Sequence, residues 1–329
     1  MKTVFICGTG RCGTTITKKV LAQHTHVFAF ENEARFIDDP KGVVDLFLKL
    51  TTHWAPWYAE RALWEFERLM LKKRSAVFTY LYKKLRKYQS NRRAFTLFAP
   101  PSYLSLDIHE HRLLVKRAME RLKQDLNLIR YPGCWHGILG GTRNPQIAFT
   151  ADFNEDRIAR ALDRFLSTIV GELMSPDGAC VWVDDSIYVH LQAPEVRKIL
   201  PAAKFVHIIR DPRDVIASYQ TKIWAPPSTI DGARMYNAIM TRWNQVKKKL
   251  PPESYLEVSF EWLMASPRQG FQRLCEFIGI PWDECLLNMD LNHAHVGRWQ
   301  NDLTPEDLQR IQSLLPIQSK EERMVEASP

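Results

Sequence analysis

The first residues that could do chemistry form a glycine-rich stretch, GTGRCGTT, which begins at Gly8. Gly8 and Gly13 have the spacing of the phosphate loop of nucleotide hydrolases, and Thr15 supplies its usual hydroxyl. Thr14 stands where that loop carries a lysine. Backbone N–H groups in such a turn before a helix can hold an anion, and Arg11 adds a cation. The stretch therefore predicts a phosphate site, with a tight strand–helix turn as the alternative.

A second group of polar residues, in KFVHIIRDPRDVIASY, could hold another phosphate. Arg210 follows an apolar run typical of a buried strand, and Asp211 and Pro212 predict a turn after it. Ser218 lies eight residues beyond Arg210, in the helix that should follow, on the same rim. A surface Arg–Asp pair that caps a helix is the alternative. Together the two groups predict a ligand with two separate anionic groups.

Strands and helices alternate around both groups, which is typical of a parallel sheet covered by helices. Buried strands are expected at 3–7, 26–30, 179–183, 204–209 and 254–260. Helices are expected at 14–24, 154–173 and 266–280. The predicted fold is therefore α/β, a parallel sheet of the P-loop type flanked by helices. Ligands of such sheets bind beyond the carboxyl ends of the strands.

Residues 42–130 differ in character, and we expect them to form a helical insertion without strands. Helical periodicity within the insertion runs over 60–88 and 107–128. The glycine and proline content of 131–145 predicts a loop. We expect a single domain over 1–317 and a disordered tail over 318–329.

The net charge of +8 is concentrated in one segment. Residues 51–130 hold 17 Lys and Arg against 7 Asp and Glu, so an anionic acceptor, a nucleic acid or a membrane surface is a candidate partner. The alternative is that the basic residues form a solvated helix face. No motif for reading DNA or RNA is present, so specific binding of nucleic acid is not expected. The six cysteines lack metal-ligand spacing, and no leader or long apolar run is present. We expect a soluble, cytoplasmic protein.

The two phosphate motifs together resemble the sulfotransferases that use 3′-phosphoadenosine 5′-phosphosulfate (PAPS). In that family a basic residue before Gly-Thr-Thr binds the 5′-phosphosulfate, and Arg-Asp-Pro-Arg with a later serine binds the 3′-phosphate. The stretch at 258–282 and the late HVGRW are also similar to family motifs. The resemblance implies a donor site formed by Thr9, Gly10, Arg11, Cys12, Gly13, Thr14, Thr15, Arg210, Ser218, Gly297 and Arg298.

The resemblance explains the missing lysine of the first loop. Transfer of a sulfuryl group from PAPS uses no nucleoside triphosphate and needs no Mg²⁺, so no metal is expected. Backbone amides, threonine hydroxyls and Arg11 can stabilise the charge that develops on the leaving group. Many relatives carry a further lysine after a strand-borne tryptophan, whereas this chain has Asp185 or its neighbour there. Either Arg11 acts alone on the leaving group, or another cation reaches it.

The acceptor must lose a proton, and FENEARFI supplies carboxylates for that task. Tyrosylprotein sulfotransferases carry Glu-x-Arg in this region, with the glutamate as base. With a one-residue insertion, Glu33 and Arg35 match that pattern, and Glu31 is the reserve candidate. Two solvated loop acids are the alternative. No spacing favours His24 or another nearby histidine.

The expected reaction is transfer of a sulfuryl group from PAPS to a hydroxyl or amine of an acceptor that the sequence does not identify. A kinase of the P-loop type is the first alternative, although the loop lysine is missing. A non-catalytic module that binds nucleotides or nucleic acid is the second.

Overall fold

The protein is described here from a computed structural model, which places residues 1–71, 111–135, 146–174, 178–289 and 295–315. Its centre is a five-stranded sheet in which every pair of neighbouring strands is parallel, in the order β2-β5-β1-β6-β7. The strands are β1 (Lys2–Gly8), β2 (Val27–Phe28), β5 (Val181–Asp184), β6 (Lys204–Ile209) and β7 (Tyr255–Ser259). All five predicted strands are therefore present, and the predicted α/β fold is confirmed.

Both faces of the sheet are buried, which explains why its strands read as nearly continuous apolar runs. Phe5 of β1, Trp182 of β5 and Phe205 of β6 belong to one core. Neighbouring strand residues such as Val4 and Val206 belong to the other core. Successive side chains of a strand point to opposite faces, so each strand contributes to both cores.

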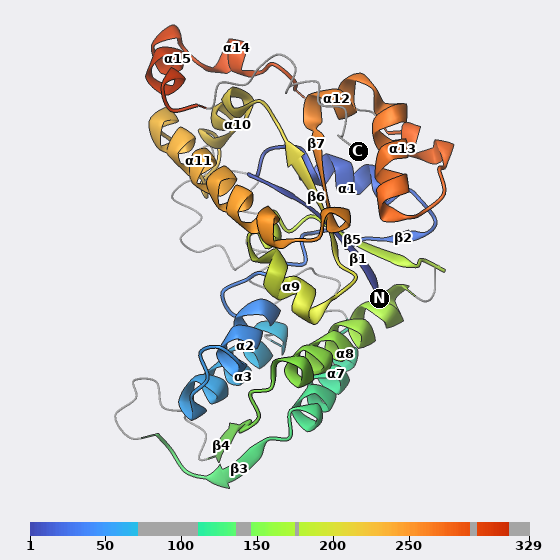
Figure 1. Cartoon of the computed structure of the whole chain (residues 1–329), viewed down its shortest axis with the longest axis vertical. Coiled ribbons are helices and arrows are strands. Elements are labelled where there is room, and N and C mark those ends of the chain that lie inside the picture. The colour runs from blue at the N-terminus through green and yellow to red at the C-terminus, as the bar shows by residue number, and fades with distance from the viewer. Residues whose placement is uncertain (72–110, 136–145, 175–177, 290–294, 316–329) are drawn as a thin grey trace, which may run out of the picture.

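Helices cover the two faces of the sheet (Figure 1). One face packs against α1 (Thr14–Leu21), α12 (Phe260–Ala265) and α13 (Pro267–Ile278). Trp243 of α11 and Val196 of α9 belong to the core of the other face. The remaining bounds in this part are α9 (Ala193–Ile199), α10 (Pro212–Tyr219), α11 (Thr229–Val246), α14 (Trp299–Asp302) and α15 (Pro305–Gln312).

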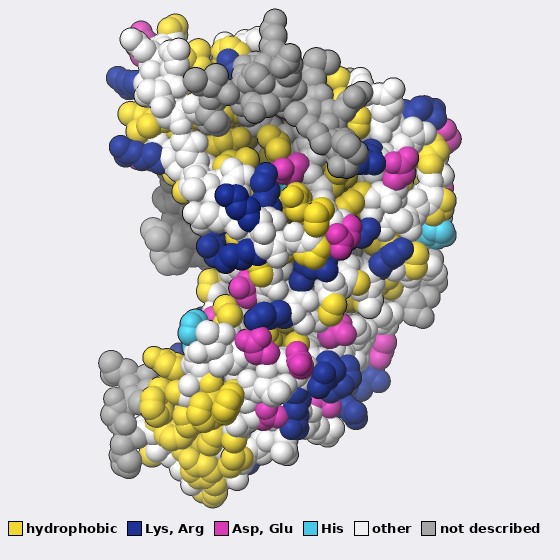
Figure 2. All heavy atoms as spheres, in the orientation of Figure 1, with side chains coloured by type: hydrophobic (Ala, Val, Ile, Leu, Met, Phe, Trp, Pro, Cys, Tyr) yellow, Lys and Arg dark blue, Asp and Glu magenta, His cyan; other side chains and the backbone are white. Residues whose placement is uncertain are grey.

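A second, mainly helical part extends away from the sheet (Figure 1). It contains α2 (Val43–Leu50), α3 (Pro56–Leu71), α7 (Arg112–Asp125), α8 (Glu155–Met174) and the antiparallel pair β3 (Ile129–Pro132) and β4 (Gln146–Phe149). Apolar side chains gather on its surface over α3 and the β3–β4 pair (Figure 2). The large exposed ones on these elements are Trp57, Tyr58, Trp64, Ile129 and Tyr131.

A loop was predicted at 131–145, but its first two residues belong to β3. The insertion at 42–130 was predicted to contain no strand, but its last two residues also belong to β3. β3 has only four residues, all of them exposed, so it is too short to be recognised from an apolar pattern. The parts of the predicted helices at 72–88 and 107–110 and the tail at 318–329 lie outside the described residues. The single domain over 1–317 stays a prediction. Among the described helices, none is long and apolar enough to cross a membrane.

Candidate active site

Most of the predicted site residues follow the carboxyl ends of the parallel strands, which meet at one edge of the sheet. The glycine loop follows β1 at the centre of the sheet, and Arg210 follows β6 on one side of it. Asp185 follows β5 on the other side, and Glu33 lies in the segment after the neighbouring β2. The order of the strands thus places the two predicted phosphate sites side by side, with the predicted base on the far side of the glycine loop.

The glycine loop leaves the start of α1 open to an anion. Gly13 caps α1 with a φ of 102°, and no side chain accepts a hydrogen bond from the first turn. A Cβ atom at Gly13 would overlap the ring of Phe260, so the position requires glycine. Arg11 and Thr15 are exposed, whereas Cys12 is fully buried in the core. Cys12 can therefore contribute only backbone groups to the predicted donor site.

Neighbouring elements hold the backbone of the glycine loop in place. The hydroxyl of Tyr219 in α10 donates to the carbonyl of Thr9 at 2.5 Å. The guanidinium of Arg210 donates to the carbonyl of Arg11 at 3.0 Å, and Gly8 N donates to Ile187 O at 3.1 Å. The loop is thus fixed from both flanking strands, as a preorganised anion site requires.

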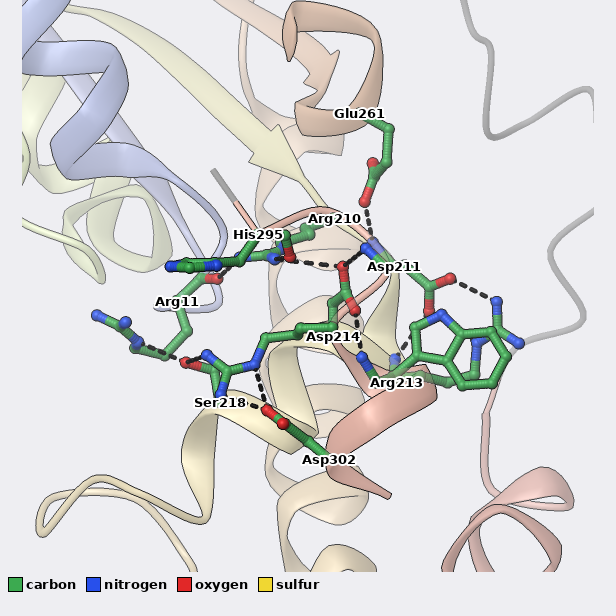
Figure 3. A network of polar contacts seen from close by, with 12 residues as sticks. Arg11, Arg210, Asp211, Arg213, Asp214, Ser218, Glu261, His295 and Asp302 are labelled. Carbon is green, nitrogen blue, oxygen red and sulfur yellow. Dashed lines mark hydrogen bonds and ion pairs between the residues drawn. The ribbon is translucent and has the colours of Figure 1, made fainter. Parts of the chain in front are cut away.

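The two predicted phosphate sites meet at Ser218, which is almost fully buried (Figure 3). Its Oγ accepts a hydrogen bond from Arg11 Nε at 2.9 Å and one from Arg298 at 3.4 Å. Residues from the glycine loop, α10 and the segment before α14 are therefore in direct contact, although about 290 positions separate the first from the last. The structure brings together Arg11, Arg210, Ser218, Gly297 and Arg298.

Asp214, which is not among the predicted site residues, joins Arg210 to the late segment (Figure 3). Its fully buried carboxylate lies 3.2 Å from the Arg210 guanidinium and accepts hydrogen bonds from Gly297 N at 2.8 Å and Trp299 N at 3.0 Å. Arg210 also donates to His295 O at 2.7 Å. The position of Asp214, one helical turn after Arg210, was the available signal in the sequence.

The charges at this end of the site favour an anion. Arg11, Arg210 and Arg298 converge on one region, and two carboxylates pair with them, Asp214 with Arg210 and Asp302 with Arg298. Partial desolvation of its guanidinium beside Ser218 lowers the pKa of Arg11, and the positive charges of Arg210 and Arg298 lower it further. An anionic ligand would relieve this repulsion, and charge-assisted hydrogen bonds are the strongest available to it.

Glu33 lies in the segment between β2 and α2 and is partly buried. Arg35 Nε is 3.7 Å from its carboxylate. Burial raises the pKa of Glu33 to about 7, the charges of Asp185, Asp184 and Asp38 raise it too, and Arg35 opposes them. A base whose pKa lies near neutral pH is suited to proton transfer. The pKa of Glu33 is in the range that suits a general base, and its role as the base stays a prediction.

The other candidate bases are less suited. Glu31 is exposed. His24 is buried, with Nε2 2.9 Å from Pro281 O, and its Nδ1 accepts a hydrogen bond from His26 N. His24 is therefore a structural residue between α1 and the segment after α13.

Asp185, which stands where many relatives carry a lysine, pairs with a cation from another element. Lys18 of α1 reaches its carboxylate at 2.6 Å, and both side chains are almost fully buried. The cation in this region thus comes from α1, which no motif indicated. Lys18 is bound to Asp185 and to two backbone carbonyls, whereas Arg11 of the glycine loop is an exposed cation.

Tyr188, shortly after β5, is a further residue that the motifs did not indicate. Burial is the main cause that raises its pKa to about 12, and Cys12, Glu33 and Asp38 also raise it. The phenol is therefore protonated and lies near both the glycine loop and the Glu33 segment.

Comparison with known proteins supports one family. A profile of the sulfotransferase family matches residues 3–284. A putative protein-tyrosine sulfotransferase from Caenorhabditis elegans is 30% identical over 108 residues, which cover 30% of this chain and 40% of that protein. One from Caenorhabditis briggsae is 27% identical over 141 residues, 40% of this chain and 48% of that protein. The matches span less than half the length of these relatives.

Comparison with solved structures also found sulfotransferases. The sulfotransferase domain from the curacin biosynthetic pathway is 13% identical, with a TM-score of 0.45 and coverage of 96% of this chain and 99% of that one. Sulfotransferase STF9 from Mycobacterium avium is 11% identical, with a TM-score of 0.45 and coverage of 95% and 75%.

Proposed function

Because this chain belongs to the sulfotransferase family, we propose that it transfers a sulfuryl group from PAPS to a hydroxyl group of an acceptor. The observation that carries the PAPS assignment is the cluster around Ser218, where Arg11 and Arg298 both donate to its Oγ and Arg210 donates to the carbonyl of Arg11. A nucleotide with separate 5′ and 3′ anionic groups matches two adjacent anion sites that share one buried hydroxyl.

Each residue has a distinct part in the proposed reaction. The open N–H groups of α1, together with Thr14, Thr15 and Arg11, hold the 5′-phosphosulfate and stabilise the charge on the leaving phosphate. Arg210 and Ser218 hold the 3′-phosphate. Glu33 accepts the proton of the attacking hydroxyl, with Arg35 beside it. PAPS supplies the sulfuryl group, so the S–O bond to its phosphate breaks as the bond to the acceptor oxygen forms.

We propose the tyrosyl hydroxyl of a polypeptide as the acceptor, by likeness to the curated relatives. The excess of Lys and Arg over 51–130 supports an acceptor segment rich in acidic residues.

The cytoplasmic location expected from the sequence stays a prediction, which fractionation of cells that express the protein would test.

The test is transfer of ³⁵S from labelled PAPS to an acidic peptide that contains one tyrosine, with the same peptide carrying phenylalanine as its control. Parallel reactions contain a simple phenol, an aliphatic alcohol or an amine. Of the two peptides, we expect only the one with tyrosine to be labelled. Transfer should continue in the presence of EDTA. Transfer of ³²P from ATP that EDTA abolishes would support the kinase alternative instead. No transfer from either donor, with tight nucleotide binding, would support a non-catalytic module.

A further inference from the structure

A buried amine ties the segment that carries Glu33 to two other elements. Lys18 Nζ lies 2.6 Å from Asp185 Oδ1 and donates to the carbonyls of Phe30 at 3.0 Å and Glu31 at 3.2 Å. An ammonium group has three protons, and three acceptors surround this one. Its side chain is only 3% exposed, so solvent does not compete for these contacts.

The adjacent carboxylate holds the same segment on the other side of Glu33. Asp184 Oδ1 accepts a hydrogen bond from Ala34 N at 2.7 Å, and its Oδ2 accepts one from Ser186 N at 2.9 Å. Asp184 is fully buried at the end of β5. Glu33 therefore lies between two fixed points, the carbonyl of Glu31 and the amide of Ala34.

We propose that Lys18, Asp184 and Asp185 form a positioning clamp that sets where the Glu33 carboxylate stands relative to the donor. The inference rests on the proposed function, because it assumes that Glu33 acts on an acceptor beside PAPS. Lys18 lies four residues after Thr14 in α1, about 6 Å along the helix axis. One helix thus carries the anion-binding amides at its start and the anchor of the base segment one turn later.

The clamp has a consequence that a merely stabilising ion pair would not have. Buried ion pairs often add little net stability compared with apolar residues of similar volume. A reacting group that is misplaced by about 1 Å can lose on the order of 10²-fold in rate. Lys18 binds backbone carbonyls of the base segment itself, so its loss should displace Glu33 and leave the glycine loop in place.

The clamp also supplies part of the charge around Glu33. Arg35 and Asp38 act on Glu33 from its own segment, and Asp184 and Asp185 act on it from the end of β5. Loss of the charge of Asp185 should lower the pKa of Glu33. The acid limb of the kcat profile should then move to lower pH in Asp185→Asn.

The primary test compares Lys18→Met with Lys19→Met, its exposed neighbour on the same helix. Three quantities are measured: adenosine 3′,5′-bisphosphate affinity by calorimetry, kcat on the tyrosine peptide, and hydrogen exchange of the segment 28–36. For Lys18→Met we expect faster exchange of that segment, a kcat lowered by roughly 10–100-fold, and bisphosphate affinity within about twofold of wild type. Lys19→Met should leave all three unchanged. Wild-type exchange and kcat in Lys18→Met would overturn the clamp.

Lys18→Met leaves Asp185 buried without its cation, which can prevent folding. Lys18→Met combined with Asp185→Asn removes both charges, so that variant should fold and stay slow. Full activity of the folded double variant would refute a positioning role. If the wild type transfers no label, the proposed function is refuted. Faster exchange of segment 28–36 in Lys18→Met would then still show that Lys18 holds that segment.

Discussion

Replacement of Glu33 by glutamine is the sharpest perturbation of the proposed chemistry. Glutamine keeps the shape and can still donate a hydrogen bond, but it cannot accept the proton of the acceptor at neutral pH. The segment that carries Glu33 is fixed by Asp184 and Lys18 through backbone atoms, so the substitution leaves those contacts intact. Any loss of rate therefore reports on the carboxylate itself.

The size and pH dependence of the effect follow from the surroundings of Glu33. General-base assistance is worth about 10²–10⁴-fold, so kcat of Glu33→Gln should fall by that factor. Burial and nearby carboxylates raise the pKa of Glu33 to about 7, and the base acts only when it is deprotonated. The wild-type kcat should therefore rise with pH through about 7, and at pH 6 roughly a tenth of the enzyme carries the active carboxylate. Glu33→Gln should lose this dependence.

The assay is steady-state transfer from PAPS to the tyrosine peptide between pH 5.5 and 8.5, with bisphosphate affinity measured alongside. Glu31→Gln is the matched control, because the same change is made two residues away at an exposed side chain. Affinity for the bisphosphate should be unaffected in both variants. Near-normal turnover in Glu33→Gln with an inactive Glu31→Gln would show that the other carboxylate is the base. Activity in both would refute a carboxylate base in this segment.

The remaining predictions concern the donor site and the core. Wild type should bind adenosine 3′,5′-bisphosphate more tightly than 5′-AMP, and Arg210→Ala should remove about 1.5–3 kcal/mol of that preference in calorimetry. Equal wild-type affinities would argue against the second anion site. Gly13→Ala should weaken bisphosphate binding, because its Cβ would displace Phe260 and the loop; unchanged affinity would contradict this. Burial lowers the pKa values of His190 and His207 below the ordinary 6.5, so the unfolded state binds more protons. Each histidine should therefore reduce the free energy of unfolding as pH falls below about 6.5, by up to about 1.4 kcal/mol per pH unit. In urea unfolding at several pH values, the free energy of unfolding of His190→Asn should depend less on pH than that of wild type.

Local patterns in the sequence were enough to predict the sheet and the family. The apolar runs of β1, β5, β6 and β7 are visible because both faces of a parallel sheet are buried. The glycine loop and the Arg210–Ser218 motif lie within short stretches of chain, so their spacing alone predicts anion binding. The resemblance to sulfotransferases that these motifs carry is confirmed by the family match over residues 3–284.

Contacts between distant segments were beyond the reach of spacing. Asp214 is one residue within a familiar motif, and only the folded chain shows that it holds Gly297 N and Trp299 N beside Arg210. The β3 strand was missed because it has only four residues and depends on pairing with β4.

Asp185, which stands where many relatives carry a lysine, shows the same difference between local pattern and tertiary contact. The sequence showed that a cation was missing from the strand end and left its source open. The tertiary structure shows that Lys18 fills this region, because the strand order places the end of β5 next to α1 and the segment after β2, so that Lys18 of α1 contacts Asp185 and two carbonyls of that segment. Residue types and local periodicity determined which groups this protein has for chemistry. The packing of parallel strand ends at one edge decided which of them meet, since that proximity depends on strand order and not on distance along the chain.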